Sequence, residues 1–157
     1  MKLFKQFYIE NKTHLFEYLM RMTGDYYLAS DILQESFTRL WSRYRTKNWC
    51  KALLFKIARN ALIDEKRKSK YRQSQELNDT HGARNYGQDF FVRESYREVL
   101  KAIQRLEPLE KDILVMKISS NLAYREIAEI VGTSEANIKI KIHRARMKLK
   151  SLIKQEG

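Results

Sequence analysis

Residues 124–146, YREIAEIVGTSEANIKIKIHRAR, decide the fold of the C-terminal part of the chain. A helix-turn-helix needs a small residue where its two helices cross, and Ala128 supplies one. Four positions on, Gly132 accepts the left-handed backbone of the turn. Ser134 is a good cap for a second helix, which Ile138 would pack against the first. The spacing therefore predicts a helix-turn-helix.

The second helix of this motif has two contrasting faces. Counted from Ser134, the buried stripe is expected to contain Ile138, Ile142, Ala145 and Leu149. The opposite face mixes cations, hydrogen-bonding groups and small apolar groups, which suits contact with phosphates and base edges. The alternative is a helical hairpin with a solvated basic face. The residues of the motif expected to contact DNA are Arg125, Thr133, Glu135, Ala136, Asn137, Lys139, Ile140, His143, Arg144 and Arg146.

The net charge of +12 is concentrated in two blocks. Residues 39–72 hold 12 basic and 2 acidic residues, and residues 134–157 hold 7 basic and 2 acidic residues. The rest of the chain is slightly acidic. Two separate basic blocks predict two contacts with a polyanion, for which nucleic acid ranks ahead of a membrane surface.

Composition and periodicity predict an all-α protein. Only 5 glycines and 1 proline among 157 residues disfavour the many turns of an all-β fold. Gly24 and Asp25 mark the end of one helix and the start of the next, and Pro108 suits the first turn of a later helix. The first helix is expected to break near Asn11. Apolar residues recur at helical spacing over residues 3–22, 32–44, 53–62 and 91–106.

The helical pattern disappears between about residues 71 and 89. The stretch SQELNDTHGARNYGQD is polar and contains Gly82 and Gly87, which is typical of a linker. We therefore expect two small helical bundles joined by a flexible linker, the C-terminal one containing the helix-turn-helix. The expected division is residues 1–72, a linker over 73–90, and residues 91–157.

Two further stretches resemble a known family. ASDILQESFTRLW (29–41) and FKIARNALIDEKRK (55–68) are similar to the second conserved region of bacterial sigma factors. Residues 106–149 are similar to the fourth. Both regions in this order, with a short linker and no third domain, resemble the extracytoplasmic-function (ECF) class. The resemblance covers about residues 3–70 and 93–153.

The resemblance implies partners and site residues. Asp31, Gln34 and Glu35 would dock on the β′ coiled coil of core RNA polymerase, and the C-terminal domain would meet the β flap and the minus-thirty-five element. The melted minus-ten strand would lie along cations with nearby aromatics, as single-stranded DNA does in general. An inhibitory anti-sigma factor is also implied, which would hold the protein at the membrane. The residues implied for the minus-ten strand are Tyr44, Arg45, Lys47, Asn48, Trp49, Lys56, Arg59, Asn60 and Arg67.

This chain departs from the family pattern at three places. Its loop before the third helix is short, and Leu53 stands where many members have Trp. In the recognition helix Ile140 replaces the usual small residue, so an altered upstream preference is expected. Trp49 could equally stack on DNA or anchor the hydrophobic core.

Two other functional classes compete with a sigma factor. A stand-alone helix-turn-helix regulator would leave the basic block at 39–72 unexplained, and it would need a dimer interface although no heptad is visible. A basic adaptor for RNA or a membrane surface is the third reading. Neither a Gly-rich phosphate loop nor a nucleophile motif appears, and the three histidines lack ligand spacing, so neither catalysis nor a metal nor a cofactor is expected. With no apolar run of 18 residues and no signal peptide, the chain is expected in the cytoplasm without membrane insertion.

Overall fold

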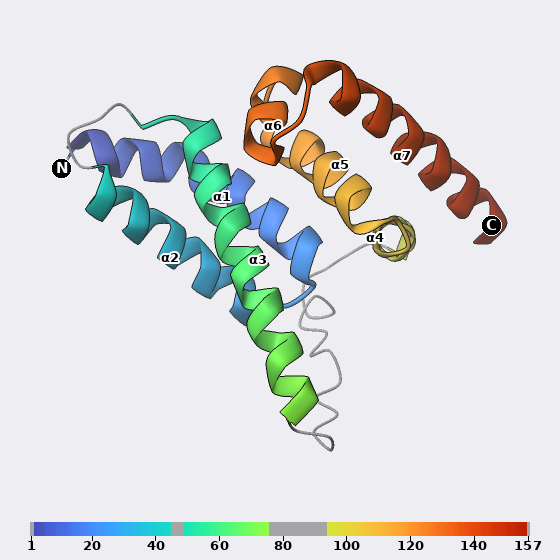
Figure 1. Cartoon of the computed structure of the whole chain (residues 1–157), viewed down its shortest axis with the longest axis horizontal. Coiled ribbons are helices and arrows are strands. Elements are labelled where there is room, and N and C mark those ends of the chain that lie inside the picture. The colour runs from blue at the N-terminus through green and yellow to red at the C-terminus, as the bar shows by residue number, and fades with distance from the viewer. Residues whose placement is uncertain (1, 45–48, 76–93, 157) are drawn as a thin grey trace.

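The computed structural model describes residues 2–44, 49–75 and 94–156, and these residues form helices and no strand. The N-terminal bundle and the C-terminal bundle lie side by side, the first with three helices and the second with four (Figure 1). The prediction of an all-α protein with two bundles is confirmed. The helices are α1 (Lys2–Thr23), α2 (Tyr26–Arg43), α3 (Lys51–Gln75), α4 (Glu94–Gln104), α5 (Pro108–Ser120), α6 (Tyr124–Val131) and α7 (Glu135–Glu156).

The first helix is continuous, so the break predicted near Asn11 is wrong. Asn11 is buried, and its Nδ2 donates a 2.9 Å hydrogen bond to the carbonyl of Phe7 within the same helix. The side chain therefore satisfies its polar group without interrupting α1. The predicted end is confirmed: Gly24 has φ +66°, and the Asp25 carboxylate caps α2 by accepting from the backbone N–H of Tyr27 at 3.0 Å.

The third helix is longer than the sequence pattern predicted. It runs to Gln75, so the first residues of the predicted linker, 73–75, are helical. Lys, Arg and Gln are good helix formers, and an exposed helix end needs no apolar stripe. Glu65 and Arg72 form an ion pair of 3.7 Å along this exposed part. The rest of the predicted linker lies outside the described residues.

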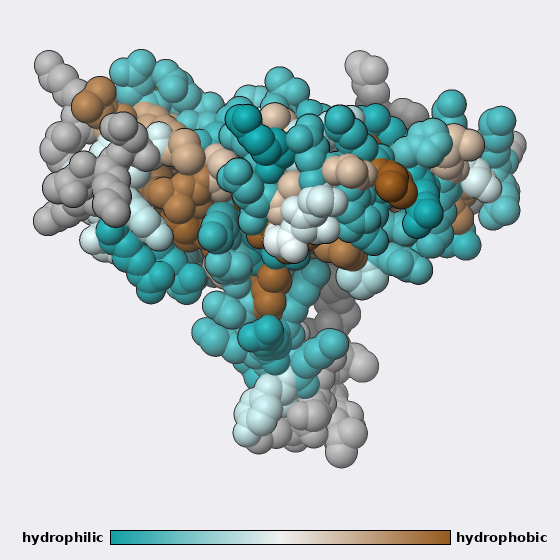
Figure 2. Space-filling view, turned by 45° about the horizontal axis from the view of Figure 1, so that its top comes forward, coloured by the Kyte–Doolittle hydropathy of each residue, from teal (hydrophilic) through white to brown (hydrophobic). Residues whose placement is uncertain are grey.

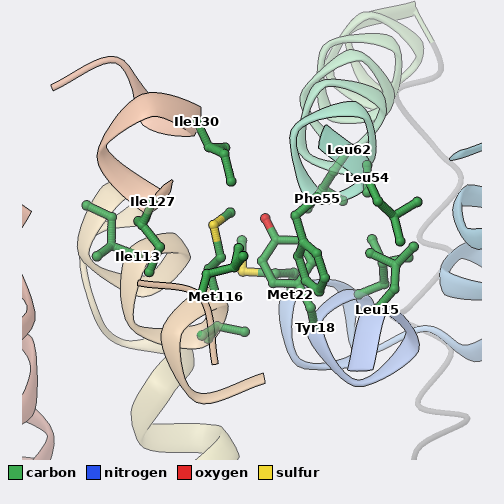
Figure 3. Packing of buried hydrophobic residues seen from close by; sticks show 14 of the residues in the cluster. Leu15, Tyr18, Met22, Leu54, Phe55, Leu62, Ile113, Met116, Ile127 and Ile130 are labelled. Carbon is green, nitrogen blue, oxygen red and sulfur yellow. The ribbon is translucent and has the colours of Figure 1, made fainter. Parts of the chain in front are cut away.

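The two bundles share one hydrophobic core. The side chains of Tyr18, Met22 and Phe55 face Met116 and Ile127 across the boundary between the bundles (Figure 3). The contacts run mainly between α1 and α5 and between α3 and α6. Such a continuous core was not predicted, and it fixes how the two bundles are placed relative to each other.

The helix-turn-helix has the geometry that its sequence predicts. Ala128 is buried, and Gly132 has φ +86° with its N–H 2.8 Å from the carbonyl of Ala128. Ser134 caps α7, since its Oγ accepts from the backbone N–H of Asn137 at 3.1 Å. Along α7, the buried or half-buried residues Ile138, Ile142, Ala145 and Leu149 form the predicted stripe.

Candidate nucleic-acid interface

The outer face of α7 carries most of the residues predicted to contact duplex DNA. Lys139 Nζ lies 3.6 Å from a carboxylate oxygen of Glu135, an exposed pair that contributes little to stability. Thr133 and Asn137 are half-buried, and Asn137 Nδ2 donates to Thr133 Oγ1 at 2.8 Å. This side-chain hydrogen bond stabilises the turn, whereas the side chains further along this face of α7 are exposed to solvent. The exposed members of the predicted set are Arg125, Glu135, Ala136, Lys139, Ile140, His143, Arg144 and Arg146.

Ile140 is an outward-facing aliphatic residue on this basic face. Its side chain is 49% exposed, while Ile138 and Ile142 on either side are buried. The side of the molecule in Figure 2 is mostly hydrophilic, with apolar side chains in small separate patches. The outward placement expected of Ile140 is therefore what the structure shows.

The basic face of α3 is exposed at three of the four predicted positions. Lys56, Asn60 and Arg67 are exposed, as expected for residues that meet a DNA strand. Arg59 differs: its side chain is only 17% exposed, and its Nε lies 2.6 Å from Oδ2 of Asp112 in the C-terminal bundle. The C-terminal bundle thus covers most of the Arg59 side chain, and the contact of Arg59 with the minus-ten strand stays a prediction.

Trp49, shortly before α3, belongs to an aromatic cluster with Phe4 of α1 and Trp41 of α2. The Trp49 ring packs on Phe4 at 5.1 Å between centroids and lies 6.1 Å from Trp41. The indole N–H of Trp49 is buried and has no hydrogen-bond partner within the described residues. Trp49 is thus placed as a core anchor, and Tyr44 packs half-buried against the same core. The predicted residues Arg45, Lys47 and Asn48 lie outside the described residues.

The residues predicted to dock on polymerase share the open face of α2. Asp31, Gln34 and Glu35 are all exposed, whereas the opposite side of the helix is buried. Glu35 pairs with Arg39 at 2.7 Å, one helical turn further on. This face is therefore free for a partner without any change in the core.

Sequence reasoning missed the polar contacts between the bundles. Asp112 is buried and accepts from both the Tyr18 hydroxyl and Arg59, each at 2.6 Å. Burial, reinforced by the neighbouring Asp112 carboxylate, raises the pKa of Tyr18 well above its ordinary value. One signal could have been used: Asp112 directly precedes the apolar run Ile113–Met116, where a carboxylate demands a partner.

Lys111, beside Asp112, is a second missed contact. Its Nζ donates to the carbonyl of Met22 at 3.2 Å and to Oε1 of Gln104 at 2.5 Å. Burial and the nearby positive charge of Lys66 lower the pKa of Lys111 to about 8. The boundary between the bundles therefore carries repulsion between cations as well as the ion pair of Arg59 and Asp112.

A helix-turn-helix with an open basic recognition helix, together with a second basic helix elsewhere in the same chain, defines a DNA-binding protein. Residues 7–72 match the family model described as Sigma-70 region 2, and residues 96–149 match Sigma-70, region 4. The ECF RNA polymerase sigma factor SigM of Bacillus subtilis is 34% identical over 143 residues, which cover 88% of this chain and 87% of SigM. SigL of Mycobacterium tuberculosis (strain H37Rv) is 26% identical over 161 residues, 99% of this chain and 91% of SigL.

The chain belongs to the ECF sigma factors of RNA polymerase, and its function is in transcription initiation. This membership decides against the stand-alone regulator and the adaptor. The same fold occurs in the sigma factor RpoE in complex with the anti-sigma factor NepR from Bartonella quintana (TM-score 0.79, 21% identity, 98% of each chain). It also occurs in CnrH in complex with the cytosolic domain of CnrY (TM-score 0.76, 18% identity, 99% of this chain and 90% of CnrH). Among the described residues, no helix is long and apolar enough to cross a membrane.

Proposed function

We propose that this sigma factor recognises promoters through two separate DNA surfaces and docks on core polymerase through a third. The recognition helix α7 reads the minus-thirty-five element, and α3 with the loop before it holds the melted non-template strand of the minus-ten element. The observation that carries this assignment is the pairing of an open helix-turn-helix with an open basic helix, each within its own matched sigma region.

On α7, the chemistry of each side chain suggests its role. Lys139, Arg144 and Arg146 supply cations for backbone phosphates, and His143 adds a hydrogen-bonding group at a base edge. Ala136 and Ile140 supply apolar surface, for which the major groove offers the C5-methyl group of thymine. Because the opposite face of the helix is buried in the bundle, only this face can enter the groove.

On α3, Lys56, Asn60 and Arg67 follow one exposed side of a long helix. Cations that track a backbone beside aromatic side chains are the general arrangement for single-stranded nucleic acid. The loop residues Arg45, Lys47 and Asn48 belong to the same proposed surface. We assign the functional units to residues 1–75 and 91–157, with the first extended to the end of α3.

The proposed role is one of binding and not of catalysis. Core polymerase forms the phosphodiester bonds, while this chain selects and opens the start site. We place the protein in the cytoplasm, where polymerase and chromosome meet, and we assign no metal or cofactor to it. RpoE was solved in complex with the anti-sigma factor NepR and CnrH in complex with the cytosolic domain of CnrY, and we propose an anti-sigma partner for this chain as well.

Transcription with reconstituted holoenzyme tests these roles. Core polymerase with the purified chain is offered a promoter library with randomised upstream and minus-ten elements, and the transcribed sequences define the preferred promoter. On that promoter, Lys139→Ala should weaken duplex binding at the upstream element, and Asn60→Ala should leave that binding but reduce permanganate reactivity of minus-ten thymines. Lys154→Ala, near the end of α7, serves as the control for loss of an exposed lysine. Normal strand opening by the Asn60 variant would contradict the role of α3.

A further inference from the structure

A cavity lies where the end of α1, the middle of α3 and the first turn of α5 meet. Its volume is about 300 Å³, at the lower end of the range for sites that bind small organic molecules. Met22 and Leu62 are buried, whereas Leu109 is 38% exposed, so the cavity has an apolar floor and an open rim. The apolar side chains that line it are Met22, Leu62, Ile63, Pro108 and Leu109.

The charged side chains of the cavity do not balance one another. Arg59, Lys66 and Asp112 line it, and Arg59 Nε lies 2.6 Å from Oδ2 of Asp112, so these two charges offset each other. Lys66 is exposed and forms no ion pair or hydrogen bond within the described residues. Glu107 and Glu110, at the same end of α5, do not line the cavity. The surplus is therefore one positive charge, which Lys66 carries at the rim.

Lys111 adds a second positive charge beside the cavity. Its Nζ donates to the carbonyl of Met22, a lining residue, and to Oε1 of Gln104, so both of its acceptors are uncharged. Burial and the positive charge of Lys66 lower the pKa of Lys111 to about 8. The charge of Lys66 thus acts on Lys111, and an anion bound at Lys66 would offset the repulsion between the two lysines.

The lining side chains decide which kind of anion fits. An ammonium is a compact point charge, so Lys66 can hold either a carboxylate or a phosphate group. The apolar floor suits an aliphatic chain, whereas inorganic phosphate would leave that floor in contact with water. Among the described residues, no aromatic side chain lines the cavity, so a nucleobase would have no ring to stack on.

We propose that this cavity is a binding site for a small amphipathic anion, whose charged head lies at Lys66 and whose aliphatic chain packs on the apolar floor. Fatty acids and alkyl phosphates share this chemistry. The chain would contact Met22, Leu62, Ile63 and Leu109. The site is independent of the proposed promoter roles, because none of these residues belongs to the surfaces assigned to DNA or polymerase.

Titration of the isotope-labelled full-length chain with hexyl phosphate and with hexanoate tests the proposal by amide NMR. Saturable binding is expected with a Kd of about 5 mM or lower, as for a fragment of this size. The amide shifts should be largest at Met22, Ile63 and Leu109. Inorganic phosphate lacks the chain and hexanol lacks the charge, so each should bind at least about tenfold more weakly. Binding of only one of the two head groups would support the site and identify the source of its ligand.

Lys66→Met should weaken binding of the hexyl probes at least about tenfold, because the head group loses its cation. Lys68→Met is the matched control, since it removes an exposed lysine of the same helix that does not line the cavity, and it should leave the affinity unchanged. Leu109→Asn, at the rim, should weaken binding of hexyl phosphate but not the weak binding of inorganic phosphate. All three side chains are exposed, so the amide spectra should show an intact fold.

Several outcomes would overturn the proposal. If inorganic phosphate or hexanol bound as tightly as hexyl phosphate, the chain or the charge would contribute nothing. Equal losses in Lys66→Met and Lys68→Met would reduce the effect to net charge. The absence of saturable binding, or amide shifts confined to α7 or to the exposed side of α3, would show that the cavity is not the site.

Discussion

The hydroxyl of Tyr18 donates a 2.6 Å hydrogen bond to Oδ1 of Asp112, 94 residues further along the chain. Tyr18 is completely buried, so its hydroxyl has exchanged water for a single charged acceptor. Tyr18→Phe keeps the ring in the core and removes only this bond. Because hydrogen bonds to charged groups are worth about 1.5–3 kcal/mol, we expect a loss of that size in the free energy of urea unfolding.

Tyr8→Phe is the control for this prediction. The Tyr8 ring packs on Phe37 at 4.7 Å between centroids, and its hydroxyl has no hydrogen bond within the described residues. Its removal should cost less than about 0.5 kcal/mol, the usual range for substitutions away from such contacts. Equal losses in the two variants would show that the contact with Asp112 contributes nothing.

Lys111 gives stability a specific pH dependence. Its pKa is lowered to about 8 by burial and by Lys66, against 10.5 in the unfolded chain. Between these values the unfolded state binds more protons, so this residue makes the folded state more stable as pH rises from about 8 towards 10.5, and less stable as pH falls through 8. Urea unfolding from about pH 7.5 to about pH 9.5 covers the pKa of Lys111. The free energy of unfolding of the wild type should rise over this range, and the rise should be absent in Lys111→Met. The exposed Lys154→Met should keep the rise.

Substitutions of Gly132 test whether the turn of the helix-turn-helix requires a residue that tolerates a positive φ. It has φ +86°, and a Cβ added there would meet no atom within 4 Å. Gly132→Ala should therefore cost about 1–2 kcal/mol of unfolding free energy through left-handed strain alone. Gly132→Asn should cost less, since asparagine tolerates this region, as Asn121 does at φ +58°. A larger loss for Asn than for Ala would point to steric crowding instead.

Ile140 tests base reading by α7. Ile140→Ser removes an outward aliphatic group and leaves the core intact, and we expect a loss of about 1 kcal/mol or more at the preferred upstream element. Replacing one thymine by uracil should reproduce the loss in wild type and add little in the variant. Met147→Ser, two turns further along α7 and 56% exposed, should bind normally. If no thymine position depends on Ile140, the residue does not read a base.

The open face of α2 tests polymerase docking. Asp31→Lys with Glu35→Lys should weaken capture of core polymerase at least tenfold while the fold persists, because both side chains are exposed and the broken pair with Arg39 is worth only about 0.3–0.5 kcal/mol. Glu10→Lys with Glu129→Lys makes the same change in net charge at exposed positions on α1 and α6. Equal capture of polymerase by both double variants would remove the docking role.

The parts that the sequence predicted well are those that depend on neighbours in the chain. Gly132, Ser134 and the stripe from Ile138 lie within one short segment, and each acts through its own turn or helix face. The end of α3 was missed because helical periodicity of apolar residues indicates packing against a core. An exposed helix of lysine and arginine has no apolar stripe and therefore gives no such signal.

The contact between the bundles could not be predicted from local pattern. Tyr18 shares its helix face with Leu15 and Leu19, so it reads as an ordinary core residue. Arg59 reads as one more cation on a basic helix. Only the three-dimensional fold brings both to Asp112, and with them it decides which of the predicted DNA contacts is covered.

The core that spans both bundles limits how freely the two regions can be exchanged between relatives. A chimera that joined α1–α3 of this chain to the second half of another sigma factor would place Tyr18 and Met22 against side chains that are not complementary to them. Without a carboxylate at the position of Asp112, Tyr18 and Arg59 would be left with donors and no acceptor on docking. The two halves are therefore expected to have evolved as a matched pair, although each reads its own stretch of DNA.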